Sequence, residues 1–284
     1  MRSLVRGALG APTQRGWRSG ALALLAAGLL TACASGSTTT TRPLSDSTAK
    51  DRATASDETD TSRRAEVRME LATAYFGRGQ MTTALDQVKL AIQADPKSVE
   101  AFNLRGLIYA NLGDDALAEE SFRHALTLRP NDADTMHNLG YFLCQRKRYA
   151  ESDAEFARAM AVPTYRGQSR TLLAQGVCQA VGGRLPEAEA TLTRAYELDP
   201  ANPSTAVNLA EVLYRRAEYD RARFYIRRVN TVPTLVSAQT LWLGARIENK
   251  LGNRRLVQDM GDQLMNRFPD SREASAYQRG KFDE

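Results

Sequence analysis

Side chains suited to acid–base or metal chemistry are scarce in this sequence. Its 284 residues include two histidines, His124 and His137. Neither has a nearby cysteine or carboxylate at the spacing of a metal site, and we find no P-loop, no Gly-x-Ser-x-Gly and no Gly-x-Gly-x-x-Gly after a strand. An enzyme would need a nucleophile with its base, a metal cluster or a phosphate cradle. We therefore interpret both histidines as solvated or packing residues and predict no catalytic site, no metal and no cofactor.

The first of the three cysteines, Cys33, ends the stretch Leu-Thr-Ala-Cys, which follows an arginine-bearing start and an apolar run at residues 21–30. Ten apolar residues are too few to span a bilayer, so residues 1–32 indicate a secretory signal peptide, with a short buried helix as the alternative. The stretch resembles the lipobox of bacterial lipoproteins, in which the cysteine sulfur receives a diacylglyceryl group and cleavage leaves this cysteine first. The resemblance implies a lipid anchor on Cys33.

The composition changes after Cys33. Residues 34–63 are rich in Ser, Thr, Asp and Ala and contain almost no large apolar residue. Such a segment cannot bury enough surface to offset the entropy lost on ordering. We predict that residues 33–63 form a lipidated N-terminus and a flexible tether. Ala34 stands where lipoproteins kept in the inner membrane often carry Asp, which favours the periplasmic face of the outer membrane, reached through the acyl chains.

The formal net charge of +5 does not indicate nucleic-acid binding. Four of the arginines lie in the predicted signal peptide, and without them 34 basic residues balance 33 acidic ones. A nearly neutral chain lacks the electrostatic footprint of a DNA- or RNA-binding protein. We predict no nucleic-acid partner and no small-molecule substrate.

A repeat of 34 residues organises the chain beyond the tether. Pro96 and Pro130 close similar segments 34 residues apart, and Pro200 closes a third after two further repeats and two inserted residues. The six repeats start near residues 65, 99, 133, 169, 203 and 237. The period indicates stacked helix pairs, and the prolines are expected to end the second helix of a pair because proline lacks an amide hydrogen. Gly113 and Gly183 are expected in turns within pairs.

Small residues at fixed places in each repeat resemble the tetratricopeptide (TPR) pattern. Large side chains at the twenty-fourth position are expected on the buried face of each second helix. The sixth repeat departs from the pattern with Leu256 at the small twentieth position. We therefore predict an all-α fold, a right-handed superhelical solenoid of about six TPR helix pairs over residues 64–280. The eighth positions are Ala72, Gly106, Gly140, Gly176, Ala210 and Gly244.

The concave surface of such a stack is made chiefly of first helices, and we expect function to reside there. The fifth and ninth positions of the first helices contain no Lys or Arg, which argues against a clamp for a peptide carboxylate. A mainly apolar groove suits a peptide or helix of another protein. The alternative is that several of these residues pack between repeats.

Cys144 and Cys178 remain as an even pair in an exported chain. They lie on the first helices of adjacent repeats, at the twelfth position of the third and the tenth of the fourth. Because these positions can meet across one interface, we predict a disulfide that clips the stack at the two-residue insertion. Two free buried thiols are the alternative.

Several features together resemble the PilF/PilW type of type IV pilus biogenesis lipoprotein, which acts as pilotin for the outer-membrane secretin. They are the lipobox, six repeats with nothing after them, the stretch NLGYFLC at 138–144 and the stretch LWLGARIE at 241–248. The resemblance implies a non-catalytic adaptor that binds secretin subunits and promotes their localisation and assembly in the outer membrane. It also implies a binding surface toward the N-terminal repeats, here Met69, Thr73, Phe76, Asn103, Leu107 and Asn111. The alternative is a TPR lipoprotein scaffold for outer-membrane protein insertion or for cell-wall enzymes.

Overall fold

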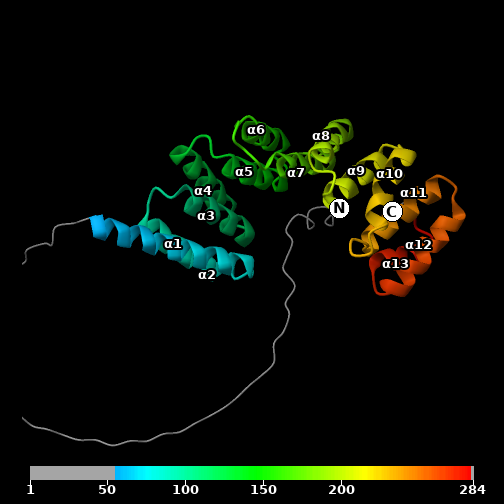
Figure 1. The fold of residues 1–284 in the computed structure, drawn as a ribbon, viewed down its shortest axis with the longest axis horizontal. Helices are drawn as coiled ribbons and strands as arrows, with labels where there is room; N and C mark the ends of the chain where they lie inside the picture. Colours follow the sequence, from blue (N-terminus) through cyan, green and yellow to red (C-terminus); the bar gives the residue numbers. More distant parts are fainter. Residues whose placement is uncertain (1–54, 283–284) are drawn as a thin grey trace, which may run out of the picture.

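The computed structural model describes residues 55–282, whose regular elements are thirteen α-helices. Figure 1 shows the helices following one another around an arch, with α1 and α2 at one end and α11, α12 and α13 at the other. None of the described helices is long and apolar enough to cross a bilayer. The elements are α1 (Ala55–Gly77), α2 (Met81–Ala94), α3 (Val99–Leu112), α4 (Asp115–Leu128), α5 (Ala133–Gln145), α6 (Tyr149–Met160), α7 (Gln168–Val181), α8 (Leu185–Leu198), α9 (Pro203–Arg215), α10 (Tyr219–Asn230), α11 (Ala238–Lys250), α12 (Arg254–Arg267) and α13 (Arg272–Gln278).

The helix ends follow the local signals of the sequence. Helices α2, α4 and α8 each end two residues before one of the three prolines at 96, 130 and 200. Four of the first helices, α3, α5, α9 and α11, begin at side-chain caps, as where Ser98 Oγ accepts a hydrogen bond from the Ala101 amide at 3.2 Å. Such a cap satisfies one of the amide groups that has no partner inside the helix. Gly113 and Gly183 adopt φ of +86° and +83° in the turns, so the predicted pairing of helices is confirmed.

Close approach of the two helices in a pair explains the small eighth position. A Cβ added to Gly106 would lie 2.7 Å from the Phe122 ring, and one added to Gly176 would lie 2.6 Å from Leu192. Both partners are fully buried residues at the twenty-fourth position. The large residue of each second helix therefore fills the space that the missing side chain leaves on the first helix.

First and second helices form two layers of the arch. In Figure 1, α5 and α7 lie on the underside while α6 and α8 lie above them. The connections 95–98, 129–132 and 199–202 between pairs have four residues, whereas 161–167 and 231–237 have seven. The predicted two-residue insertion thus falls in or beside the 161–167 connection.

The boundary of the predicted tether needs correction. Helix α1 begins at Ala55, although we expected the tether to continue to residue 63. Residues 55–63 contain neither proline nor glycine, so nothing stops the helix from extending beyond its packed part. Packing begins at Ala65, which is 7% exposed, close to the predicted start of the repeats. Cys33, the signal peptide and residues 33–54 of the tether lie outside the described residues.

The end of the stack also differs from the prediction of six repeats with nothing after them. Helix α13 packs against α11 and α12, and a Cβ on Gly261 would overlap the Tyr277 ring. In the described residues, this last helix covers apolar surface of the sixth pair in the place where a following repeat would pack. Leu256 is 39% exposed, so the large residue at the twentieth position is not accommodated between the two helices of the sixth pair.

Candidate protein-binding surface

Side chains of consecutive first helices contact one another along the inner layer. Asn138 Nδ2 on α5 donates a hydrogen bond to Asn103 Oδ1 on α3 at 3.0 Å. We call these contacts the inner ladder, and they hold α3 against α5, α5 against α7 and α9 against α11. Its members are Asn103–Asn138, His137–Thr171, Cys144–Cys178 and Glu211–Arg246.

His137 packs within the inner ladder. Its Nδ1 lies 2.9 Å from Thr171 Oγ1, and its ring lies 5.8 Å from the Phe156 ring. Burial, together with the nearby Arg170 charge, lowers the pKa of His137 to about 4, so the ring is neutral near pH 7. His124 is exposed on α4. Among residues 55–282, no group of His, Cys, Asp and Glu side chains could hold a metal ion.

The disulfide joins the third and fourth repeats. Cys144 on α5 and Cys178 on α7 are bonded, with their Cα atoms 5.9 Å apart, and Cys178 is fully buried. The bond spans the pair of repeats between which the 161–167 connection runs. It therefore fixes the first helices where the regular spacing of the repeats is interrupted.

Two of the six residues predicted to contact a partner are open to solvent. Thr73 on α1 and Asn111 on α3 are exposed. Asn111 Nδ2 donates to the carbonyl of Leu107 in its own helix at 2.8 Å, which leaves its Oδ1 outside that bond. Both side chains could meet a partner without any change in the packing of the repeats.

The other four predicted residues are half-buried. Met69 and Phe76 pack against the core of the first two repeats, and Leu107 packs against the next core. Asn103 is held by Asn138 in the inner ladder. Packing between repeats, the alternative stated above, thus explains why these four side chains are partly buried. That they also contact a partner stays a prediction.

An exposed apolar face of α1 was not foreseen. Val67 and Leu71 are 49% and 37% exposed, whereas Ala101 and Leu139, at the corresponding third and seventh positions of later repeats, are fully buried. In those repeats the preceding pair covers this face, and the first repeat has no preceding pair within residues 55–282. The sequence already contained this information, because a terminal repeat normally carries polar residues on its outer face and the first repeat carries Val67 and Leu71 there.

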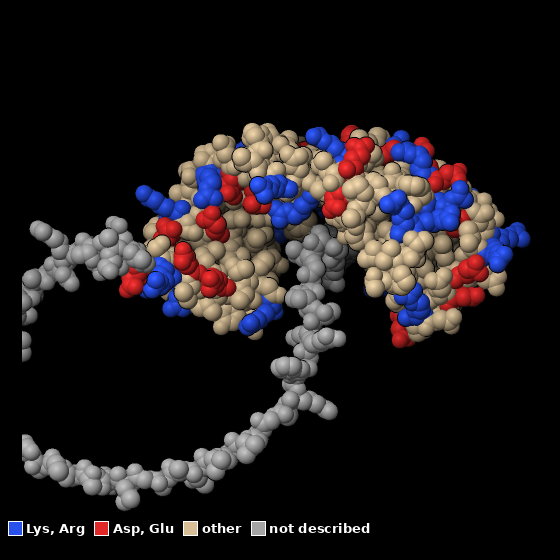
Figure 2. Space-filling view, in the orientation of Figure 1, with Lys and Arg blue, Asp and Glu red and all other residues tan. Residues whose placement is uncertain are grey.

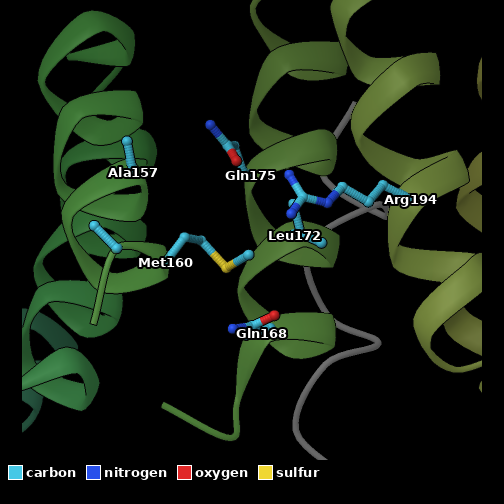
Figure 3. A pocket seen from close by; sticks show the side chains of 7 residues that line it. Ala157, Met160, Gln168, Leu172, Gln175 and Arg194 are labelled. Carbon is cyan, nitrogen blue, oxygen red and sulfur yellow. The ribbon is translucent and has the colours of Figure 1, made fainter. Parts of the chain in front are cut away.

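A shallow cavity of about 330 Å³ lies between α6, α7 and α8. Figure 3 shows Met160 and Arg194 reaching from α6 and α8 toward Leu172 on α7. The lining residues include one cation and no acid or nucleophile, so the cavity offers no catalytic group. In the view of Figure 2, acidic and basic side chains are interspersed along most of the arch, and one group of basic side chains lies toward its C-terminal end.

Paired helices that stack through their first helices define a domain of tetratricopeptide (TPR) repeats, a fold whose concave surface commonly binds other proteins. TPR family models match residues 69–133, 133–162 and 182–230. The chain is 34% identical to PilW, a widely conserved type IV pilus biogenesis factor whose crystal structure is known. The two structures align with a TM-score of 0.69 over 75% of this chain and 97% of PilW.

Two comparisons with Pseudomonas aeruginosa PilF agree. The chain is 27% identical over 213 residues to the type IV pilus assembly protein PilF, covering 75% of this chain and 84% of PilF. The solved PilF structure is 25% identical, with a TM-score of 0.67 over 78% of this chain and 99% of that one. The chain belongs to the PilF/PilW family of type IV pilus assembly TPR proteins.

Proposed function

We propose that the protein is a lipid-anchored adaptor on the periplasmic face of the outer membrane, which binds secretin subunits and promotes their localisation and assembly. The observation that carries the proposal is the match to PilW along 97% of that chain, because it aligns the stack as a whole with a pilus biogenesis factor. The non-catalytic inner surface agrees with a role in protein binding.

The proposal divides the work among three parts of the chain. Acyl chains on Cys33 supply membrane affinity, since several chains hold a protein on a bilayer where a single chain is marginal. The segment between Cys33 and α1 supplies reach. The TPR surface supplies specificity, and tethering raises the effective concentration of the bound partner at the membrane.

We place the secretin contact at the N-terminal repeats. Thr73 and Asn111 are exposed there, and the open face of α1 adds Val67 and Leu71. An apolar face of this kind can accept an amphipathic helix, because it already has the shape that a neighbouring helix covers in later repeats. Polar side chains at its edge would set the register of the bound segment.

The test uses charge substitutions that spare the core. Thr73→Glu with Asn111→Glu should weaken capture of detergent-solubilised secretin at least about tenfold, because a buried unpaired carboxylate loses its hydration. The matched control is Thr83→Glu with Asn266→Glu, which places the same changes at exposed positions of second helices. Circular dichroism melts should agree for both proteins. Intact capture by the Thr73/Asn111 variant, or equal loss in the control, contradicts the placement of the site.

The anchor is tested separately. Cys33→Ala should leave the repeats folded, as seen by circular dichroism, and should remove the protein from the outer-membrane fraction. Secretin should then fail to reach the outer membrane at the normal level, although capture in detergent persists. A variant that fractionates like the unmodified protein disproves the anchor. Recovery of cell-wall enzymes or outer-membrane insertion factors in place of secretin would favour the scaffold alternative.

A further inference from the structure

The chain turns back toward the inner layer after α13. Gly280 adopts a φ of +65°, in the left-handed region that favours glycine, and the Lys281 amide donates to the Ala276 carbonyl at 3.0 Å. This cap ends the helix and redirects the chain to Phe282. Figure 1 shows the red α13 lying beside α11 and α12 at the end of the arch.

Phe282 contacts the inner layer through its ring and its main chain. The ring stacks on Trp242 of α11 with centroids 5.2 Å apart, and the Tyr277 ring meets it edge-on at 6.1 Å. The carbonyl oxygen accepts hydrogen bonds from Arg246 Nε at 3.2 Å and from Tyr214 Oη at 3.4 Å. One aromatic side chain and one carbonyl group therefore make the contacts by which a peptide ligand is commonly held.

The surface beneath Phe282 is polar as well as aromatic. The Arg246 guanidinium lies 4.4 Å from the centre of the Tyr214 ring and 3.9 Å from the Glu211 carboxylate. Burial raises the pKa of Glu211, which the two neighbouring arginines partly oppose. Glu211 stands at the ninth position of its repeat, where residues were expected to line the groove. If Phe282 only covered apolar surface, the charged side chains of Glu211 and Arg246 would not be needed beneath it.

We propose that this end of the inner surface, formed by Tyr214, Trp242 and Arg246, is a peptide-binding site, and that Phe282 occupies it as an intramolecular competitor. The ligand is a non-helical segment of a partner protein that presents an aromatic side chain and a free carbonyl group. The tail itself shows which chemistry fits. The proposal is independent of the identity of the partner at the N-terminal repeats.

Competition follows from the short link between α13 and Phe282. Three residues separate Phe282 from the end of α13, and short links give effective concentrations of about 1 mM. A free peptide with a Kd of about 0.1 mM would therefore find about nine-tenths of the sites occupied by the tail. The intact chain should bind such a peptide about tenfold more weakly than a chain without the tail.

Trp242 provides the measurement, because Trp17 is the only other tryptophan and can be changed to Phe. The truncated protein is the full chain ended after residue 279, which keeps all of α13. The probe is a synthetic peptide of residues 278–282 with blocked ends, and the control peptide carries Phe282→Ala. We expect the truncation to expose Trp242 to acrylamide quenching and the probe to reverse the change with saturation. The control peptide should bind at least about tenfold more weakly.

The full-length variant Phe282→Ala is the control for a folding defect caused by truncation. It should bind the probe like the truncated protein, with an unchanged circular dichroism spectrum. A probe that does not bind either tail-deficient protein overturns the proposal and leaves Phe282 as a permanent cap. Equal binding to the intact and tail-deficient proteins also overturns it, because the tail would then not compete. Neither outcome depends on secretin binding.

Discussion

The size of the residue at the eighth position is matched to its partner at the twenty-fourth. Gly106 faces Phe122, and Gly176 faces Leu192, whereas Ala72 shares its cluster with the smaller Val88. In the fifth repeat an alanine at the eighth position shares its cluster with Ile226, which is as large as Leu192, so the shape of the partner matters as well as its size. We predict that the two positions are energetically coupled, so that the effect of one substitution changes sign with the identity of the other residue.

The change Gly106→Ala has two opposing effects in the intact protein. Alanine in a helix interior is favoured over glycine by about 1 kcal/mol. The new Cβ would lie 2.7 Å from two carbons of the Phe122 ring, which is fully buried and also contacts the Phe142 ring at 5.9 Å. Forcing such a side chain aside costs about 1 to 3 kcal/mol. The net expectation is a loss of up to about 2 kcal/mol of unfolding free energy.

The change Phe122→Val, combined with Gly106→Ala, recreates the Ala–Val pair found in the first repeat. It removes the ring and should itself destabilise, because large-to-small changes in a core leave a cavity. In this background Gly106→Ala no longer meets the ring and should stabilise the protein by about 1 kcal/mol. Urea unfolding followed by circular dichroism measures all four proteins of the cycle, and the coupling energy should fall at about 1 to 3 kcal/mol.

A backbone control separates steric conflict from a general effect of replacing glycine. Gly113 has a φ of +86° and nothing near its added Cβ. Gly113→Ala should cost about 1 kcal/mol in both backgrounds, because the left-handed conformation is strained for alanine whatever Phe122 becomes. Additive effects of Gly106→Ala and Phe122→Val, or the same sign in both backgrounds, would refute the matching of sizes.

Two further predictions concern the inner ladder. Cys144→Ser with Cys178→Ser should cost about 3 to 4 kcal/mol, given a bridge between residues 34 apart, and urea unfolding measures the loss; two free thiols in the denatured, unreduced protein would contradict the bond. The folded-state pKa of His137 lies below its unfolded value of 6.5, so the unfolded chain takes up the proton first and stability falls with pH below 6.5. Between pH 7 and 5 the loss from this residue should reach about 2 kcal/mol, and His137→Gln should remove it whereas His124→Gln should not.

The regular part of the fold could be predicted because its causes lie within one period of sequence. Pro96 marks a helix end and Gly106 marks a close contact, and both recur at the same spacing. The disulfide followed from the same periodicity, since Cys144 and Cys178 fall on the facing first helices of neighbouring repeats. Position within the repeat sufficed in these cases because each repeat contacts mainly its neighbours.

Features that break the period could not be predicted in the same way. Residues 55–63 have the composition of the tether, yet they continue α1, because a helix that is already packed extends without a new nucleation step. Exposure within the predicted groove also differs between neighbours, as Thr73 is open while Phe76 is half-buried. Repeat position gives the direction of a side chain, but its length decides whether it reaches the adjacent core.

The apolar surface is covered at the C-terminal end of the stack but exposed at the N-terminal end, and this difference determines where a partner helix can pack. At the C-terminal end α13 buries Ala274 to 1% exposure and Phe282 stacks on Trp242, so the last pair already has a cover. At the other end Val67 and Leu71 have no cover within residues 55–282. A partner helix that continues the stack would gain apolar burial at α1 without displacing anything, whereas at the C-terminal end it must first displace the tail. Under the proposed function, this asymmetry favours secretin binding at α1 and makes the C-terminal site the weaker and exchangeable one.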